Sequence, residues 1–265
     1  MRISEYVRTL AVALKTVALG GNVASLSLMT KPKSFVSYSS ESLFLYKTIT
    51  GKGRLQQKSV FEVVPCASIE EIKLAKLPDS GIYFSSLPGF TQDLISLCLL
   101  CRALTPRVIF EIGTLAGYTA LQFAVNAPEA QVYTLDLPSS AGPSLPTTMM
   151  DSHHAESHRR VKKLAFEDVP EVKGRVHCLY GDSATFDFSP FYKQVDLFFV
   201  DGAHSYEYVR SDTLNAMRCC RPGGWVAWHD FGRAGVNGVS RYLFELAPTR
   251  EIYSIPGGSL AFAHF

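Results

Sequence analysis

A strand, a glycine-bearing turn and the start of a helix follow one another in Val108-Ile-Phe-Glu111-Ile-Gly113-Thr-Leu-Ala-Gly117-Tyr118-Thr119. In an open parallel sheet, ligands bind beyond the carboxyl ends of the strands, and glycines at such a turn let the backbone approach a ligand closely. The segment therefore predicts a parallel α/β sheet with a ligand site at the end of this strand.

Downstream of this segment, short apolar runs alternate with helical patterns. Each run is bounded by Gly, Pro or Asp and is almost continuously apolar, as expected for strands covered on both faces. The clearest helix spans residues 206–220 and stops at Arg221-Pro-Gly-Gly224. Strands that alternate with helices indicate an α/β fold with a Rossmann-like, doubly wound and mostly parallel sheet of seven strands. The predicted parallel strands are residues 107–112, 131–135, 175–180, 195–200 and 225–228.

The last two strands are expected to be antiparallel. Residues 251–255 and 259–265 have the composition of strands, and only Pro256-Gly-Gly258 lies between them. A parallel crossover takes about a dozen residues or more, so a connection this short joins antiparallel neighbours.

Residues 1–90 lack the alternation and are expected to form an appendage to a ligand-binding domain at residues 91–265. We expect one or two helices, followed by a β-hairpin of residues 43–50 and 55–64 around a turn at 51–53. The apolar N-terminal helix favours a lid or a homodimer contact for this appendage.

Composition and charge exclude several kinds of partner. Lys and Arg number 26 against 24 Asp and Glu, and the net charge of +2 gives no strong field for nucleic acid or an anionic membrane. The N-terminal apolar run is interrupted by Lys15 and by Gly20-Gly-Asn22, so it falls short of the roughly 20 residues of a membrane span. Six cysteines at irregular spacing do not suit a disulfide scaffold. These features predict a cytoplasmic protein without a membrane span.

Acidic side chains follow the next two predicted strands as well. Asp136 lies 23 positions after Gly113, where an acid can accept hydrogen bonds from both hydroxyls of a ribose. Asp182 and Ser183 end the strand after that. The first turn is E-x-G-x-x-x-G rather than G-x-G-x-x-G, with Glu111 where a pyrophosphate would be repelled. This charge disfavours a nicotinamide dinucleotide and suits a ligand with an ammonium or sulfonium group.

At these residues the chain resembles the class I S-adenosylmethionine-dependent methyltransferases, over roughly residues 90–265. The resemblance implies S-adenosylmethionine as the cofactor. It also implies that Asp136 holds the ribose and that Asp182 and Ser183 flank the adenine. The methionine part of the cofactor would be held by the glycine turn and the start of the following helix, through Glu111, Gly113, Gly117, Tyr118 and Thr119.

Two further acids, Asp201 and Asp230, each end a strand of the parallel run, so both are expected at the same edge of the sheet. Two carboxylates there repel each other unless a positive charge lies between them, and a divalent cation with oxygen ligands is the usual solution. Asp201 could instead cap the helix that follows it, because Asp is a favoured N-cap residue.

The signatures D-G-x-H-x-Y-E and H-D of a methyltransferase subfamily are matched by Asp201-Gly-Ala-His204-Ser-Tyr-Glu207 and by His229-Asp230. This subfamily contains sugar and macrolide-glycoside O-methyltransferases and is related more distantly to catechol O-methyltransferases. The resemblance implies that Asp201, which also borders the cofactor, and Asp230 hold a metal ion such as Mg²⁺. It implies that His204 is the catalytic base. The chain departs from the subfamily at His229, which as a ligand would favour Mn²⁺ or another transition metal.

The function that these residues favour is that of an O-methyltransferase acting on a hydroxyl of a small or glycosidic acceptor. His204 is expected to take the hydroxyl proton near neutral pH, where histidine ordinarily titrates. Two alternatives stay open: an NAD-dependent oxidoreductase, and a catalytically idle, cofactor-binding module that recruits a partner. The acceptor is not predicted, because the appendage and the Pro/Ser/Thr-rich loop of residues 138–155, which should shape its pocket, carry no motif.

Overall fold

The computed structural model describes residues 55–64, 70, 72–73, 90–158, 161, 163–233 and 235–265. The chain divides into Met1–Lys52 and Gly53–Phe265, and all described residues fall in the second unit. The predicted N-terminal helices, the first hairpin strand and the homodimer contact therefore lie outside the described residues. The domain boundary near residue 90 stays a prediction. No helix in the described part of the chain is long and apolar enough to cross a membrane.

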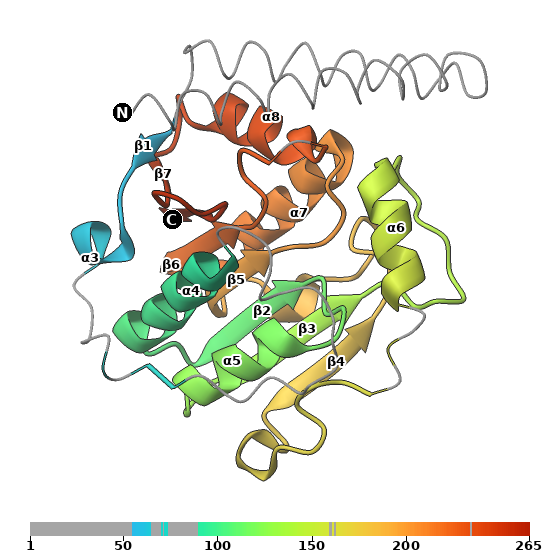
Figure 1. Ribbon diagram of the computed structural model, residues 1–265, viewed down its shortest axis with the longest axis horizontal. Coiled ribbons are helices and arrows are strands. Elements are labelled where there is room, and N and C mark those ends of the chain that lie inside the picture. Colours follow the sequence, from blue (N-terminus) through green and yellow to red (C-terminus); the bar gives the residue numbers. More distant parts are fainter. Residues whose placement is uncertain are drawn as a thin grey trace, which may run out of the picture. The chain divides into compact units, whose positions relative to one another are not determined.

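One eight-stranded sheet organises the described residues, in the order β1-β7-β8-β6-β5-β2-β3-β4 (Figure 1). All neighbouring strands are parallel except at β8, which runs antiparallel to both β6 and β7. The predicted parallel sheet with an antiparallel C-terminal pair is confirmed, and β1 adds an eighth strand at the edge. The strands are β1 (Gln56–Gln57), β2 (Val108–Ile112), β3 (Gln131–Asp136), β4 (Val176–Tyr180), β5 (Val195–Val200), β6 (Cys220–Trp228), β7 (Ile252–Ser254) and β8 (Ala261–His264).

Helices cover both faces of the sheet. Helices α4 and α5 pack together on one face, and helices α7 and α8 pack together on the other (Figure 1). The helices are α3 (Val60–Val63), α4 (Phe90–Leu104), α5 (Tyr118–Asn126), α6 (Met149–His158), α7 (Tyr206–Cys219) and α8 (Asn237–Leu246), with single 3₁₀ turns at Pro170–Val172 and Ser189–Phe191.

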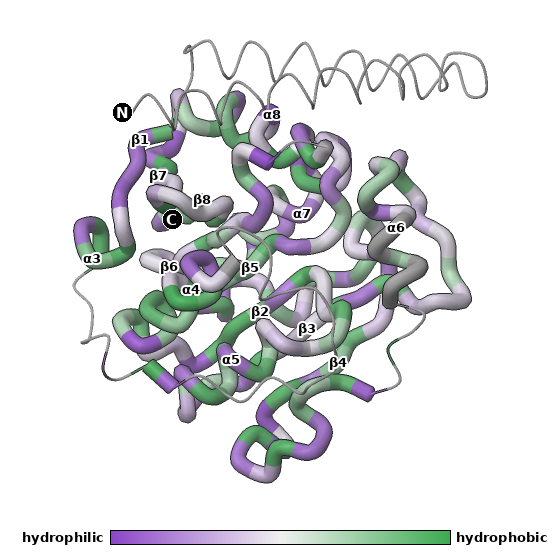
Figure 2. Tube along the Cα trace, in the orientation of Figure 1, coloured by the Kyte–Doolittle hydropathy of each residue, from purple (hydrophilic) through white to green (hydrophobic). Residues whose placement is uncertain are grey.

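Alternate residues of the central strands enter two separate hydrophobic clusters. Ile109 and Leu197 belong to the cluster that includes residues of α4 and α5, whereas Phe110 and Phe198 belong to the cluster that includes residues of α7 and α8. All four side chains are fully buried, and each contributes about 1.5–3 kcal/mol to folding. Figure 2 shows the hydrophobic colours along β2 and α4. Burial on both faces makes the central strands rigid supports for the residues that follow them.

The predicted strand over residues 55–64 is confined to Gln56–Gln57, which pairs parallel with Tyr253 and Ser254 of β7. The chain then turns into α3, because Ser59 and Glu62 form a helix start: the Ser59 backbone N–H donates to Glu62 Oε2 at 2.7 Å. A Ser followed three residues later by Glu is a helix N-terminus signal, and it overrides the β-branched composition here.

Part of the predicted loop at residues 138–155 is helical, because α6 begins at Met149. The helix start is fixed by Asp151, whose Oδ2 accepts a hydrogen bond from the backbone N–H of Thr148 at 2.6 Å. Upstream, the backbone N–H of Ser144 donates to Asp182 at 2.6 Å. The first contact lies within the segment and fixes the start of α6, and the second attaches the segment to the body of the protein.

Candidate active site

The carboxyl ends of β2, β5 and β6 bring the predicted site residues to one edge of the sheet. The register pairs Ile112 of β2 with Val200 of β5, and Val200 with Trp228 of β6. The residues that follow these strand ends therefore lie next to one another. The order of the sheet reverses between β2 and β5, which is the position where open α/β sheets bind their ligands.

Gly113 and Gly117 are required by the shape of the turn after β2. Both have positive φ, +102° and +75°. A Cβ on Gly113 would lie 2.0 Å from the carbonyl oxygen of Asp201, and a Cβ on Gly117 would lie 2.6 Å from the ring of Phe166. The turn therefore packs directly against the end of β5 and leaves no space for a side chain at either position.

Asp136, at the end of β3, shapes the same turn. Its Oδ2 accepts a hydrogen bond from the backbone N–H of Leu115 at 2.7 Å, and its Oδ1 accepts one from the N–H of Leu137 at 2.9 Å. Tyr118 and Thr119 begin α5 immediately after the turn. The residues predicted to hold the methionine and ribose parts of a cofactor are thus neighbours in space.

Glu111 is completely buried at the end of β2. Its Oε2 accepts a hydrogen bond from the Thr134 hydroxyl at 2.6 Å, and burial raises the pKa of the carboxyl well above its usual range. Burial therefore favours the neutral form of Glu111 in this structure. The sequence argument assumes a charged Glu111, and the deep burial of the strand end, which the sequence does not show, opposes that charge.

Asp182 and Ser183 follow β4, beside Asp136. The backbone N–H of Gly181 donates to the carbonyl oxygen of Asp136 at 3.0 Å. The Asp182 carboxylate accepts hydrogen bonds from the Ser144 N–H and, at 2.9 and 3.0 Å, from the Tyr208 hydroxyl. In this structure Asp182 therefore links the segment before α6 to α7, a contact that the sequence does not predict.

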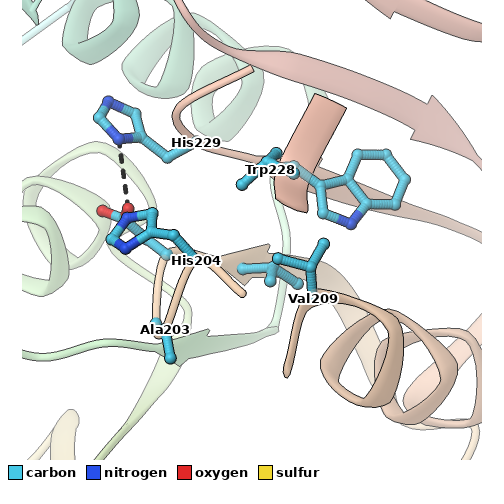
Figure 3. A pocket seen from close by; sticks show the side chains of 9 residues that line it. Ala203, His204, Val209, Trp228 and His229 are labelled. Atoms are coloured by element: carbon cyan, nitrogen blue, oxygen red, sulfur yellow. Dashed lines mark ion pairs between the residues drawn. The ribbon is translucent and has the colours of Figure 1, made fainter. Parts of the chain in front are cut away.

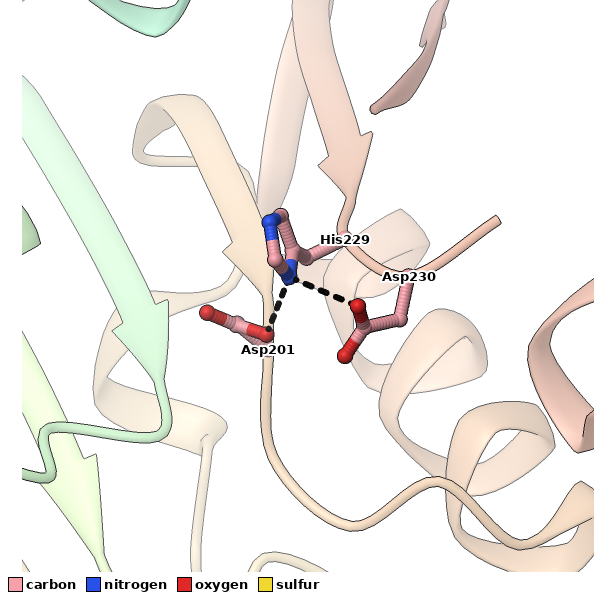
Figure 4. Close-up of side chains that lie close together, drawn as sticks. All are labelled: Asp201, His229 and Asp230. Carbon is pink, nitrogen blue, oxygen red and sulfur yellow. Dashed lines mark ion pairs between the residues drawn. The ribbon is translucent and has the colours of Figure 1, made fainter. Parts of the chain in front are cut away.

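Asp201, His229 and Asp230 form a compact cluster at the ends of β5 and β6 (Figure 4). His229 Nδ1 lies 3.2 Å from Asp201 Oδ1 and 3.3 Å from Asp230 Oδ1. One ligand atom from each residue lies within 4.8 Å of the other two. Asp230 also pairs with Arg233, whose Nη1 is 3.0 Å from Oδ1. Asp201 and Asp230 are thus brought together as predicted from the sequence, and His229 joins them.

His229 faces a third acid on its other side. Its Nε2 lies 3.5 Å from Oδ2 of Asp93, a buried residue in the first turn of α4. Burial disfavours the charged ring, but the surrounding carboxylates, Asp201 foremost, raise the pKa of His229 well above its usual range. The surrounding carboxylates therefore favour the protonated form of His229 in this structure. Sequence reasoning missed Asp93, because nothing in the chain near it indicates a contact with β6.

His204 lies between two carboxylates, just after β5. Its Nδ1 lies 2.5 Å from Asp151 Oδ1, and its Nε2 lies 2.8 Å from Asp230 Oδ2. Burial disfavours the charged ring, but the two acids outweigh burial and raise the pKa of His204 to about 10. The expectation that His204 titrates near neutral pH is therefore wrong for this arrangement. Figure 3 shows His204 and His229 on the wall of a small cavity that Ala203, Val209 and Trp228 also line.

The segment that carries these residues is similar to a known family. Residues 110–231 match the model of a family described as "Methyltransferase domain". This segment runs from β2 to just beyond Asp230, so it contains the glycine turn, the acids after β3 and β4, and the Asp201/His229/Asp230 cluster. Residues 110–231 are a methyltransferase domain.

The solved structures that resemble this chain include several methyltransferases and also spermidine synthases. TomG from Streptomyces achromogenes, an O-methyltransferase solved with S-adenosylmethionine, is 23% identical, with 71% of this chain and 82% of that chain covered and a TM-score of 0.43. An O-methyltransferase from Bacillus cereus in complex with S-adenosylhomocysteine is 18% identical, covering 78% and 95%, with a TM-score of 0.46. CalS11, a TDP-rhamnose 3′-O-methyltransferase, is 17% identical, covering 66% and 80%, with a TM-score of 0.47.

Sequence reasoning missed Asp151, which lies 53 positions before His204 in the segment that was predicted as a loop. The signal that could have found its local role is Thr148-Met-Met-Asp151, a helix-capping pattern. Its contact with His204 depends on how α6 packs in the methyltransferase fold, and no spacing in the sequence shows that.

Proposed function

We propose that the protein is an O-methyltransferase that transfers the methyl group of S-adenosylmethionine to a hydroxyl of a small or glycosidic acceptor, assisted by a divalent cation. In this reaction the bond between the methyl carbon and the sulfonium sulfur breaks, and a bond between that carbon and the acceptor oxygen forms. The sulfonium becomes a neutral thioether, and the hydroxyl proton passes to a base. The observation that carries the proposal is the cluster of Asp201, His229 and Asp230, with His204 beside it, at the ligand-binding edge of a methyltransferase domain.

The cofactor would lie along the turn after β2. Gly113 and Gly117 permit the positive-φ turn along which the methionine part would lie, and Asp136, held beside the turn, would accept hydrogen bonds from the ribose hydroxyls. A bound ammonium group beside Glu111 would favour its ionised form. A neutral Glu111 does not repel a pyrophosphate, so what argues against a nicotinamide cofactor is the match to a methyltransferase domain.

The donor atoms of the cluster suit a divalent cation. Ligand atoms on one octahedral ion at 2.0–2.1 Å lie about 3 Å apart when adjacent, and the spacings from His229 Nδ1 to the two carboxylates are 3.2 and 3.3 Å. Asp201 is about a quarter exposed, so the cluster is reachable from outside. When bound, the cation would lower the pKa of the acceptor hydroxyl and orient it. A ring nitrogen among the ligands favours Mn²⁺ or another transition metal over Mg²⁺.

His204 would take the proton of the acceptor hydroxyl through Nε2. In this structure that nitrogen faces Asp230, and the pKa of the ring is raised by the carboxylates on either side. His204 becomes a competent base when the negative charge of Asp230 is engaged by another group, because the raised pKa depends on that charge.

The proposal is tested by methyl-transfer assays with labelled S-adenosylmethionine against panels of diols, catechols and glycosides, with Mg²⁺, Mn²⁺ or a chelator present. We expect turnover that is highest with Mn²⁺ and that falls about 10²- to 10⁴-fold in His204→Ala, the range of a lost general base. Tyr206→Phe, which removes only a hydroxyl bonded to exposed Glu245, is the matched control and should retain turnover. Full turnover of His204→Ala would remove His204 from the mechanism.

A further inference from the structure

We propose that Asp151 is a positioning residue, which fixes the imidazole of His204 so that only Nε2 faces the reaction space. The inference rests on the proposed role of His204 as the base. Asp151 itself lies in the first turn of α6 and, across the ring, is separated from Asp230 by the width of His204.

The two carboxylate oxygens of Asp151 contact different groups. Its Oδ1 accepts a hydrogen bond from the backbone N–H of His204 at 3.0 Å and lies 2.5 Å from the ring Nδ1. Its Oδ2 accepts a hydrogen bond from the backbone N–H of Thr148 at 2.6 Å. The carboxylate cannot rotate without losing contacts to both segments, so it fixes the backbone and the ring of His204 together.

The consequence for His204 is a defined orientation. An N–H at Nδ1 points to Asp151, and Nε2 points toward Asp230 and the cluster. A ring flipped by 180° about its Cβ–Cγ bond would present carbon atoms to both carboxylates. An acid that orients a histidine in this way is the arrangement by which a general base is held for proton transfer.

The simpler interpretation is that Asp151 only caps α6. A cap needs one oxygen on an N–H of the helix start, which Oδ2 supplies. A capping role does not explain why Asp151 Oδ1 contacts both the backbone N–H and the ring of His204. Nor does it explain why the side chains of both residues are more than nine-tenths buried. Ser144, bonded to Asp182, attaches the segment before α6 independently, so α6 is held near the site without the Asp151 contact.

The two interpretations predict different kinetics for Asp151→Ala and Asp151→Asn. If Asp151 positions His204, kcat of Asp151→Ala falls about 100-fold, the effect of a misplacement of roughly 1 Å, while the acceptor KM and the S-adenosylhomocysteine Kd stay within about 2-fold. Asp151→Asn keeps an acceptor oxygen and should recover part of the loss. The imidazole ¹⁵N resonances of His204, read at one pH, should shift in both variants.

Thr148→Ala is the matched control, because it removes the Thr148 hydroxyl from the helix start but leaves the backbone N–H that Asp151 accepts. It should retain kcat. Unchanged kcat in both Asp151 variants, together with loss of turnover in His204→Ala, would overturn the positioning role and leave the proposed function standing. Retained turnover in His204→Ala would overturn both. If Asp151→Ala does not fold, unchanged kcat and unshifted His204 resonances in Asp151→Asn would be sufficient to reject the inference.

Discussion

The pKa values of two buried side chains at the carboxyl edge of the sheet are raised, that of His204 to about 10 and that of Glu111 well above its usual range. Both pKa shifts follow from what surrounds the side chain. At His204 the neighbouring carboxylates outweigh the effect of burial, and at Glu111 burial is the largest effect. The net charge of the site therefore differs from the charge obtained by counting every acid as negative and every histidine as neutral. Ligands that bring positive charge to Glu111 or to Asp230 would shift both groups toward the forms that catalysis requires.

Gly113→Ala should destabilise the protein and abolish cofactor binding, because the added Cβ would lie 2.0 Å from the Asp201 carbonyl oxygen at a backbone φ of +102°. We expect a loss of at least about 2–3 kcal/mol in the free energy of unfolding, from strain and displacement together. Gly174→Ala is the matched control: its φ is +79°, but nothing lies within 4 Å of the added Cβ. It should lose only about 1 kcal/mol. Equal losses in urea denaturation of the two variants would contradict the packing of the turn against β5.

Asp212, on α7, gives the protein a pH-dependent stability. Burial raises the pKa of its carboxyl to about 7, although the Ser183 hydroxyl opposes the shift. A folded-state pKa above the unfolded value of 3.8 means that the folded protein binds the proton more tightly. The contribution is therefore greatest below about pH 4 and is lost as the pH rises toward 7.

Asp212→Asn removes this titration. We expect the variant to gain stability relative to the native sequence by an amount that grows between pH 5 and pH 8, reaching roughly 1–3 kcal/mol. Urea denaturation at a series of pH values measures the difference. A difference that is the same at every pH would show that Asp212 does not titrate in this range.

At the scale of elements, the first turn of α4 connects the C-terminal strands to the cluster of Asp201, His229 and Asp230. Asp93 accepts hydrogen bonds from the backbone N–H groups of Ser259, at 2.8 Å, and Leu260, at 3.0 Å, and faces His229 Nε2. A carboxylate behind a histidine ligand fixes the ring and makes its other nitrogen a better donor. α4 therefore contributes to the cluster without supplying a ligand of its own.

Asp93→Ala should weaken Mn²⁺ binding about 10- to 100-fold, the usual effect of losing a carboxylate behind a metal-ligating histidine. Gln92→Ala is the matched control, because Gln92 hydrogen bonds to Pro256 in the same C-terminal turn but does not contact His229. Calorimetric titration with Mn²⁺ measures both variants. Equal Mn²⁺ affinities of the two variants would mean that Asp93 stabilises only the C-terminal turn and does not support His229.

For the molecule as a whole, the sequence predicts the parallel sheet because each central strand is a short apolar run that ends in Gly, Asp or a turn. The edge positions of Glu111, Asp136, Asp201 and Asp230 follow from that sheet, since parallel strands end on the same side. The contacts of Asp93 and Asp151 do not follow, because each depends on how a helix packs far along the chain. The raised pKa of His204 could not be predicted for the same reason.

We expect this sheet edge to bind S-adenosylmethionine next to a divalent cation held by Asp201, His229 and Asp230. The most direct test is calorimetric titration of the protein with S-adenosylhomocysteine in chelator, in Mg²⁺ and in Mn²⁺, with Asp136→Ala alongside. We predict saturable binding at one site in the native sequence, severe loss of that binding in Asp136→Ala, and a change of heat or affinity with metal that is larger for Mn²⁺. No binding under any of the three conditions, or undiminished binding by Asp136→Ala, would contradict the assignment of the site.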